Sequence, residues 1–116
     1  MDVSYILESL NEKQREAVTS ESPHLLVLAG AGSGKTRVLV HRVAWIVDGF
    51  RSNPGTIMTV TFTNKAANEM QSRIQELLKS PVPELWCGTF HGLAHRTLKR
   101  FYKEANLISG FTILDA

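Results

Sequence analysis

The chain has 116 residues, of which 43% are hydrophobic and 21% charged, and its formal net charge at pH 7 is +2. This composition predicts one soluble globular domain with a hydrophobic core and excludes a disordered tail. The single cysteine, Cys87, excludes an internal disulfide and fits a reducing cytoplasm, where we expect the protein to reside. The N-terminus lacks the pattern of a signal peptide, and no apolar stretch approaches the roughly 20 residues that cross a bilayer, so we expect no membrane association.

Helices and strands are expected to alternate along the chain. A helix is predicted from about Asn11 to Thr19, and the apolar run His24–Ala29 predicts a strand buried on both faces. The next strands are predicted at 56–62, at 85–90 and at 111–116. Between them, apolar residues at helical spacing run from Leu39 to Phe50, from Ala66 to Leu78 with Asn64 as N-cap, and from Ala94 to Ala105. This alternation predicts an α/β fold, a parallel sheet with helices on both faces.

A glycine-rich segment, "AGAGSGKT", lies between the first predicted strand and the next helix, at Ala29–Thr36. Glycines allow successive backbone N–H groups to point at one anion, and the helix N-terminus adds a partial positive charge. Lys35 can then reach the β- and γ-phosphates, and the Thr36 hydroxyl can coordinate Mg²⁺. The strict P-loop pattern begins with glycine, so Ala29 makes this the relaxed form. The segment predicts a site for a nucleoside triphosphate; the alternative is a turn that precedes Lys-Thr by chance.

The segment "LNEKQREAV" offers two roles for Gln14. Asn11 and Gln14 have the spacing of a helix N-cap and its reciprocal partner. A glutamine amide can also read the edge of an adenine, because it offers a donor and an acceptor side by side. The local sequence alone favours the cap.

Two further polar segments follow the second and third predicted strands. They are "VTFTNKAANEM" at Val60–Met70 and "GTFHGLAHR" at Gly88–Arg96. Aromatic faces stack on bases while small polar groups hold phosphates, and the carboxyl ends of parallel strands line the ligand crevice. Taken singly, Phe62 and Phe90 are better explained as core residues.

The three segments in this order make Leu10–Arg96 resemble the start of superfamily 1A DNA helicases of the UvrD/Rep/PcrA type, and the UvrD branch above all. The resemblance covers nearly the whole chain. It implies a P-loop (RecA-like) sheet, with residues 1–116 as the N-terminal part of the ATP-binding motor domain 1A. It also implies an ATP hydrolase that moves 3′→5′ along single-stranded DNA in repair and replication, with ATP and Mg²⁺ as cofactors. Single-stranded DNA is the expected partner. Other repair proteins are candidate partners of the full helicase that the resemblance implies.

The resemblance also assigns residues. It implies that Lys35 and Thr36 are catalytic, with Thr36 on Mg²⁺, and for Gln14 it favours the adenine role, which can coexist with the cap. The implied nucleotide contacts are Gln14, Ala31, Gly32, Ser33, Gly34, Lys35, Thr36 and Arg37. The implied DNA contacts are Phe62, Thr63, Asn64, Lys65, Thr89, Phe90 and His91.

Hydrolysis also needs carboxylates to hold Mg²⁺ and to position water. The family supplies them from an adjacent Asp-Glu pair in motif II, and this chain has no two adjacent acidic residues. "FTILDA" superficially resembles the strand that carries such a carboxylate, but the resemblance favours Asp115 as a strand-end residue ahead of motif II. We therefore expect the chain alone to be inactive as a motor.

Two alternatives to the helicase interpretation remain. A generic P-loop nucleotide-binding protein or small-molecule kinase explains Gly32–Thr36 but leaves the two polar segments unexplained, and a third reading is an interaction fragment that binds neither ligand. The last helix carries basic residues that form either a solvated face or a DNA-tracking surface. They are His95, Arg96, Lys99, Arg100 and Lys103.

Overall fold

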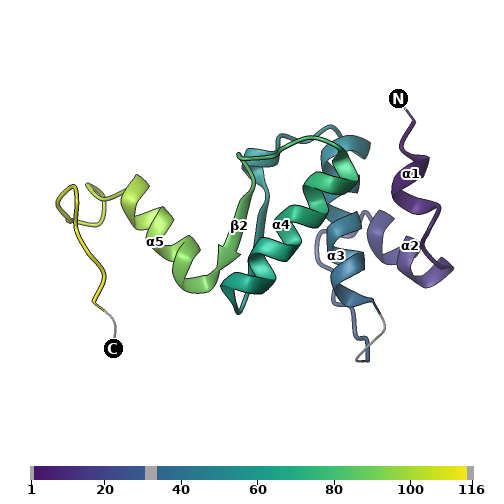
Figure 1. The fold of residues 1–116 in the computed structure, drawn as a ribbon, viewed down its shortest axis with the longest axis horizontal. Coiled ribbons are helices and arrows are strands. Elements are labelled where there is room, and N and C mark those ends of the chain that lie inside the picture. Colours follow the sequence, from purple (N-terminus) through teal and green to yellow (C-terminus); the bar gives the residue numbers. More distant parts are fainter. Residues whose placement is uncertain (1, 31–33, 115–116) are drawn as a thin grey trace.

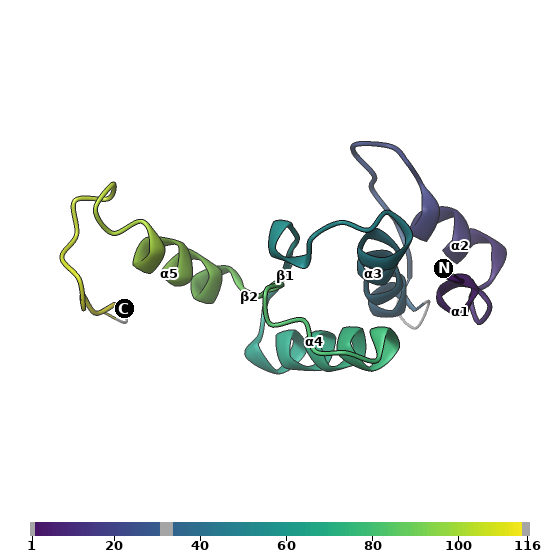
Figure 2. The same ribbon diagram turned by 90° about the horizontal axis from the view of Figure 1, so that it is seen from above.

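The computed structural model of the chain describes residues 2–30 and 34–114. The elements lie in a row, with the N-terminal helices at one end and the last helix at the other (Figures 1 and 2). The principal extents of 49 × 33 × 26 Å reflect this elongated arrangement. The helices are α1 (Ser4–Leu7), α2 (Glu12–Thr19), α3 (Lys35–Ala44), α4 (Asn64–Leu78) and α5 (Phe90–Arg100), with a π-helical turn at Trp45–Gly49 and a 3₁₀ turn at Pro54–Thr56. None of these helices is long and apolar enough to cross a membrane.

Two of the predicted strands form a parallel sheet. β1 (Met58–Thr61) pairs with β2 (Trp86–Thr89), with Met58 opposite Trp86 and Thr61 opposite Thr89. Helix α4 connects the two strands, so the segment is a β-α-β unit in which both strands end at the same edge. The side chain of Thr63 accepts a hydrogen bond from the backbone N–H of Ala66. The N-cap of α4 is therefore Thr63, one residue before the predicted Asn64.

The first and last predicted strands are wrong for the described residues. Residues 24–29 form no strand, and Leu26 and Leu28 are 82% and 86% exposed. Residues 111–114 also lack strand structure, and Asp115 lies outside the described residues. A strand buried on both faces needs hydrogen-bonded neighbours and covering helices. Here α3 packs against α2 and α4 and leaves the apolar run uncovered, so the observed architecture is α/β with a small sheet of two strands.

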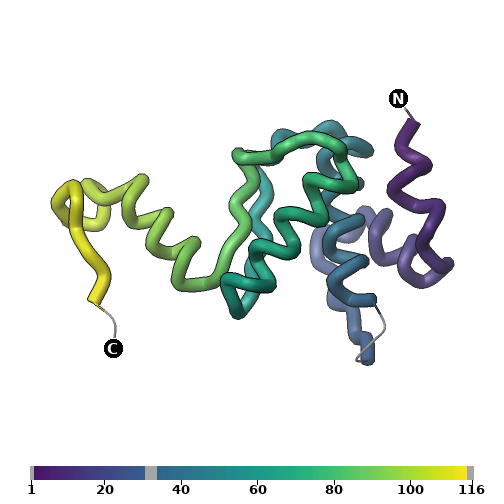
Figure 3. Tube along the Cα trace, in the orientation of Figure 1, coloured from purple at the N-terminus to yellow at the C-terminus, as the bar shows by residue number. Residues whose placement is uncertain are grey.

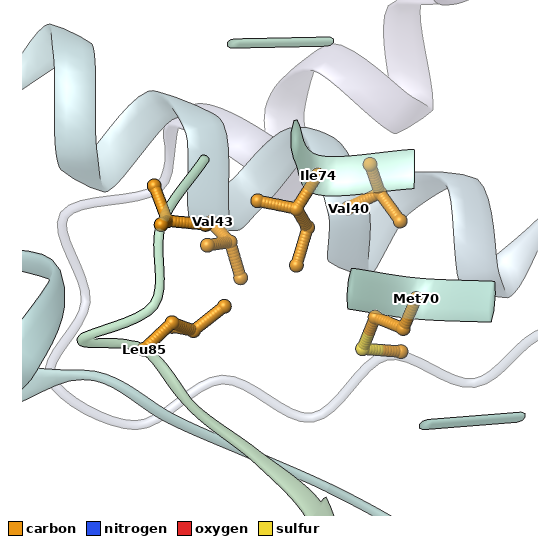
Figure 4. Packing of buried hydrophobic residues seen from close by; sticks show 6 residues of the cluster. Val40, Val43, Met70, Ile74 and Leu85 are labelled. Atoms are coloured by element: carbon orange, nitrogen blue, oxygen red, sulfur yellow. The ribbon is translucent and has the colours of Figure 1, made fainter. Parts of the chain in front are cut away.

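The main core lies between α3, α4 and the loop that leads into β2. Its buried members are Val40, Val43, Met70, Ile74, Val82 and Leu85 (Figure 4). The apolar positions of these helices were predicted with the correct helical spacing, but some buried residues lie one position after the predicted ones. Leu39 is 51% exposed while the next residue, Val40, is buried, and Ala67 is buried in place of Ala66.

Helix α2 is fixed to α3 by apolar packing and by one arginine. Val18 of α2 and Ala44 of α3 belong to a second buried cluster. The Arg42 guanidinium donates hydrogen bonds from Nη1 to the carbonyl oxygens of Ala17, Val18 and Ser20, at 3.3, 2.9 and 2.6 Å. These carbonyls lie at the C-terminal end of α2, where backbone acceptors have no partner within the helix. The arginine therefore serves as a tertiary cap that sets the position of α2 against α3.

Helix α5 extends away from the other helices, and residues 101–114 continue beyond it (Figure 3). Leu93 is the buried residue of this helix. The chain after α5 turns back, and the ring of Phe111 meets His95 edge-on at 5.7 Å. Most of the surface of α5 is consequently exposed.

Candidate nucleotide and DNA site

Gln14 takes the capping role that the local sequence favours. The backbone N–H of Gln14 donates to Asn11 Oδ1 at 2.9 Å, and the backbone N–H of Asn11 donates to Gln14 Oε1 at 3.0 Å. This reciprocal pair is a complete capping box at the start of α2. It holds the Gln14 side chain at the end of the helix that faces the start of α3.

Gln14 and Lys35 line one cavity of about 230 Å³ between α2, α3 and the segment before the glycines. Gly34 adjoins this cavity as the N-cap of α3, with a φ of +84° that favours glycine. A Cβ atom at position 34 would lie 2.9 Å from Gln14 Nε2. The backbone angle therefore favours glycine here, and a side chain at this position would also displace the amide of Gln14. The start of α3 thus places Lys35 and Gln14 at one cavity.

Thr36 faces a different cavity. It lines a groove of about 440 Å³ together with Leu39, Phe62 and Thr63. Lys35 and Thr36 are consecutive, so the first turn of α3 separates the cavity that holds Gln14 from the groove that reaches the end of β1. The predicted nucleotide residues and the predicted DNA residues thus meet at one turn.

Arg37 lies apart from Lys35 and Gln14. Its Nη2 donates to the backbone oxygen of Ser9 at 3.2 Å, and it lines a third cavity with Tyr5 and His41. The structure therefore does not bring Arg37 together with the other predicted nucleotide residues. Ala31, Gly32 and Ser33 lie outside the described residues.

The ends of the two strands place two aromatic rings side by side. Phe62 follows β1 and Phe90 begins α5, and their ring centroids are 5.6 Å apart with an interplanar angle of 44°. The two side chains are 89% and 60% exposed. The interpretation of either as a core residue is therefore wrong for the described structure. The pair forms an apolar surface at the edge where both strands end.

Two threonines shape the same edge. Thr63 Oγ1 accepts from the N–H of Ala66 at 3.1 Å, and Thr89 Oγ1 accepts from the N–H of Gly92 at 3.0 Å. Each threonine is the N-cap of the helix after its strand. A threonine hydroxyl also carries one hydrogen, so each cap retains a donor that can point to a phosphate oxygen. The other predicted DNA residues lie exposed in the first turns of α4 and α5: Asn64, Lys65 and His91.

The electrostatics of the described residues give no preformed metal site. No group of three or more His, Cys, Asp or Glu side chains gathers to hold a metal ion within residues 2–30 and 34–114.

Away from the strand ends, the Tyr5 hydroxyl donates a hydrogen bond to Asp48 Oδ2. Burial, this hydrogen bond and the charge of Asp48 together raise the pKa of Tyr5 to about 12.

Sequence reasoning missed Arg42 and Trp86. Arg42 was not singled out, although it sits in the last turn of α3, and its role depends on the tertiary placement of α2. Trp86 opens β2, and the guanidinium of Arg96 lies 4.3 Å from its ring centroid. An aromatic residue at the start of a strand gives no signal of a cation ten positions later. Contacts of this kind follow from the fold.

Comparison with known proteins assigns the family. The family model of the UvrD/REP helicase N-terminal domain matches residues 10–116. The chain is 60% identical to DNA helicase II of Escherichia coli K12 and 59% identical to that of Salmonella typhimurium LT2, in each case over the whole chain and 16% of the relative. It is 47% identical to the ATP-dependent DNA helicase PcrA of Leuconostoc citreum, over 99% of the chain and 16% of the relative. The chain belongs to the UvrD/REP helicase family and corresponds to an N-terminal part of its members.

Proposed function

We propose that the chain is the ATP- and single-strand-binding N-terminal segment of an ATP-dependent DNA helicase that moves 3′→5′ in DNA repair and replication. The relatives are named DNA helicase II and ATP-dependent DNA helicase PcrA, and the chain spans 16% of their length. The observation that carries the proposal is the arrangement around the first turn of α3. Lys35 lines a cavity with Gln14, and the next residue, Thr36, lines a groove with Phe62 and Thr63.

The nucleotide is proposed to bind between α2 and the start of α3. The α3 N-terminus supplies backbone N–H groups and a partial positive charge, and Lys35 supplies the full charge for the phosphates. Gln14 lies beside Gly34 and is proposed to read the adenine edge while it caps α2. Thr36 is the proposed ligand of the Mg²⁺ that accompanies ATP, a hard cation that prefers oxygen donors.

We further propose that residues 24–29 become a strand of a P-loop (RecA-like) sheet when neighbouring strands are present. The run "HLLVLA" is apolar, yet Leu26 and Leu28 are 82% and 86% exposed. Burial of these two side chains would contribute about 2 kcal/mol each. The segment already leads directly into the glycines, as a P-loop strand does.

The DNA strand is proposed to cross the edge where β1 and β2 end. Phe62 and Phe90 offer exposed ring faces for bases, and Thr63 and Thr89 offer hydroxyl donors for phosphates. Lys65 and His91, in the first turns of α4 and α5, add basic groups at the same edge. Stacking of this type accepts every base, as a translocating protein requires.

Calorimetry with MgATP tests the nucleotide site. Lys35→Ala should remove most of the binding, while Lys79→Ala, at the exposed end of α4, should leave it unchanged. Equal affinity of the Lys35→Ala variant and the unchanged protein would refute the phosphate site.

Titration with single-stranded DNA separates the proposal from its alternatives. A small-molecule kinase or generic nucleotide-binding protein would bind MgATP without binding an oligothymidylate. An interaction fragment would bind neither. Because the chain has no adjacent acidic pair, we also expect no DNA-stimulated ATP turnover from the 116 residues alone.

A further inference from the structure

The exposed face of α5 carries a basic cavity that the strand-end site does not use. The cavity measures about 400 Å³ and is lined by Trp86, Gly92, His95, Arg96, Lys99 and Arg100. The five helical positions follow the spacing of a single helix face. Since successive helical residues are about 100° apart, Phe90 and Lys99 point in opposite directions. The cavity and the aromatic pair are therefore on different faces of the helix.

Trp86 lies beside the cations of this cavity. The Arg96 guanidinium carbon lies 4.3 Å from the Trp86 ring centroid, and that of Arg100 lies 6.0 Å from Trp86 and 5.8 Å from Phe101. A guanidinium stacked on an aromatic face keeps its N–H groups in the plane of the fork, directed past the ring edge. Those donors are matched in geometry to two oxygens of one phosphate. Arg96 thus lies within cation–π distance of Trp86, and its guanidinium N–H groups are donors that suit an anion.

The cations of this cavity form no ion pair with any acidic group of the described residues. The single ion pair in residues 2–30 and 34–114 joins Lys13 and Glu16, far from α5 in the sequence. From Phe90 to Lys103 the chain contains no Asp or Glu. Arg96 and Arg100 are four positions apart, and like charges at this spacing destabilise a helix. A solvated helix face usually mixes charges of both signs, whereas this face carries positive charges alone, which favour an anion as the partner.

We infer that the Trp86–Arg96–Arg100 cavity is a second nucleic-acid site, which holds backbone phosphates of the DNA strand after it leaves the aromatic pair. This inference rests on the proposed function. Charge complementarity identifies the occupant, because a DNA strand presents a regular row of phosphates and α5 presents a row of cations. The cavity contributes affinity without base preference, since its donors face phosphates.

The salt dependence of DNA binding by the full-length protein tests the inference. Fluorescence anisotropy would follow an oligothymidylate, with Arg96→Gln/Arg100→Gln as the test variant and Lys79→Gln as a control outside the cavity. Loss of two phosphate contacts should reduce the slope of log K against log salt by about 1.4. If the DNA affinities of the unchanged protein and the double variant become equal near 1 M salt, the double variant should bind about 25-fold more weakly at 0.1 M. Lys79→Gln should leave both quantities unchanged.

Further titrations test whether the cavity recognises the phosphate charge and whether it needs the guanidinium group. An oligothymidylate with neutral methylphosphonate linkages should bind the unchanged protein and the double variant equally, because it lacks the charges that the cavity holds. Arg96→Lys should fall between the unchanged protein and the double variant, since lysine keeps the charge but lacks the planar fork. Single-stranded and duplex DNA are titrated in parallel: a slope reduced for the single strand supports the site, and a slope reduced for the duplex alone overturns it.

The outcomes separate this inference from the proposed function. If the unchanged protein binds no oligothymidylate, the proposed function and the inference both fail. If it binds, and the double variant has the slope and affinity of Lys79→Gln, the inference alone is overturned. A double variant that melts earlier and loses nucleotide affinity with an unchanged slope would assign the cavity to contacts within the protein, which also overturns the inference.

Discussion

Replacement of Phe62 by alanine distinguishes a DNA contact from a core residue. Phe62 is 89% exposed, so about a tenth of its roughly 200 Å² of surface is covered by protein. At 25 cal/mol per Å², that contact contributes about 0.5 kcal/mol to stability. The paired ring of Phe90 adds about 1 kcal/mol. We therefore expect Phe62→Ala to lower the free energy of unfolding by about 1.5 kcal/mol, against roughly 3–5 kcal/mol for a phenylalanine in a core.

Ile74→Ala is the matched core control, because Ile74 is 0% exposed in the cluster between α3 and α4. We expect this control to lose about 2–5 kcal/mol. Equilibrium urea unfolding measures both variants. For DNA affinity the expected order of the two variants is reversed, with the larger loss in Phe62→Ala. Loss of one stacked base costs about 1–3 kcal/mol, so Phe62→Ala should bind an oligothymidylate about 5- to 150-fold more weakly, largely independent of sequence.

The nucleotide affinity of Phe62→Ala without DNA should persist, because the Lys35 cavity does not include the ring. The reasoning is refuted if Phe62→Ala loses as much stability as Ile74→Ala while its folded fraction binds DNA normally. That pattern would place Phe62 in a packed interior. Phe90 is a weaker probe, since it is 60% exposed and its truncation removes about 2 kcal/mol of burial as well.

Three more predictions follow from single contacts. Gln14→Ala should lower the free energy of unfolding by about 1 kcal/mol and erase a preference for ATP over GTP. Asn11→Ala, the control, should lose only the cap and keep the preference. An unchanged preference in Gln14→Ala would leave the cap as the sole role of this side chain. Arg42→Met should lose about 2–3 kcal/mol in urea unfolding, with partial recovery in Arg42→Lys, because its three bonds cap α2. Burial and Asp48 raise the pKa of Tyr5 to about 12, so the free energy of unfolding should be unaffected below pH ~10, the unfolded pKa, and fall as the pH rises through 12. Tyr5→Phe should abolish that decline, and an absorbance titration of the phenolate near pH 10 would contradict it.

Local patterns in the sequence predicted those elements that depend on near neighbours. The capping box of Asn11 and Gln14, the helical stripes and the β-branched strand at Met58–Thr61 all depend on contacts within a few residues. Asn64 was one residue off as a cap, because Thr63 also has a side-chain oxygen and the strand ends just before it. Adjacent capping residues cannot be ranked by composition alone.

The strand at residues 24–29 could not be settled from its own sequence. An apolar run predicts burial, but burial requires neighbouring strands, and these are long-range partners. Arg37 shows the same limit at the site. The family resemblance implies a nucleotide contact for Arg37, whereas its side chain reaches the Ser9 carbonyl in the described structure. The direction of a long side chain depends on acceptors that the fold brings near it.

The groove beneath Thr36 links the two proposed ligands physically. Thr36 lies in α3 and Phe62 directly follows β1, yet both line this groove, together with Leu39, which is 51% exposed. If the proposed nucleotide moves Thr36 when it binds, it also changes the groove that Phe62 lines. Lys35 faces the opposite cavity, so one helical turn presents a charge to the phosphates and a hydroxyl to the groove. Allosteric coupling requires a ligand to favour one arrangement over another, and the first turn of α3 is the element that both ligands would bias.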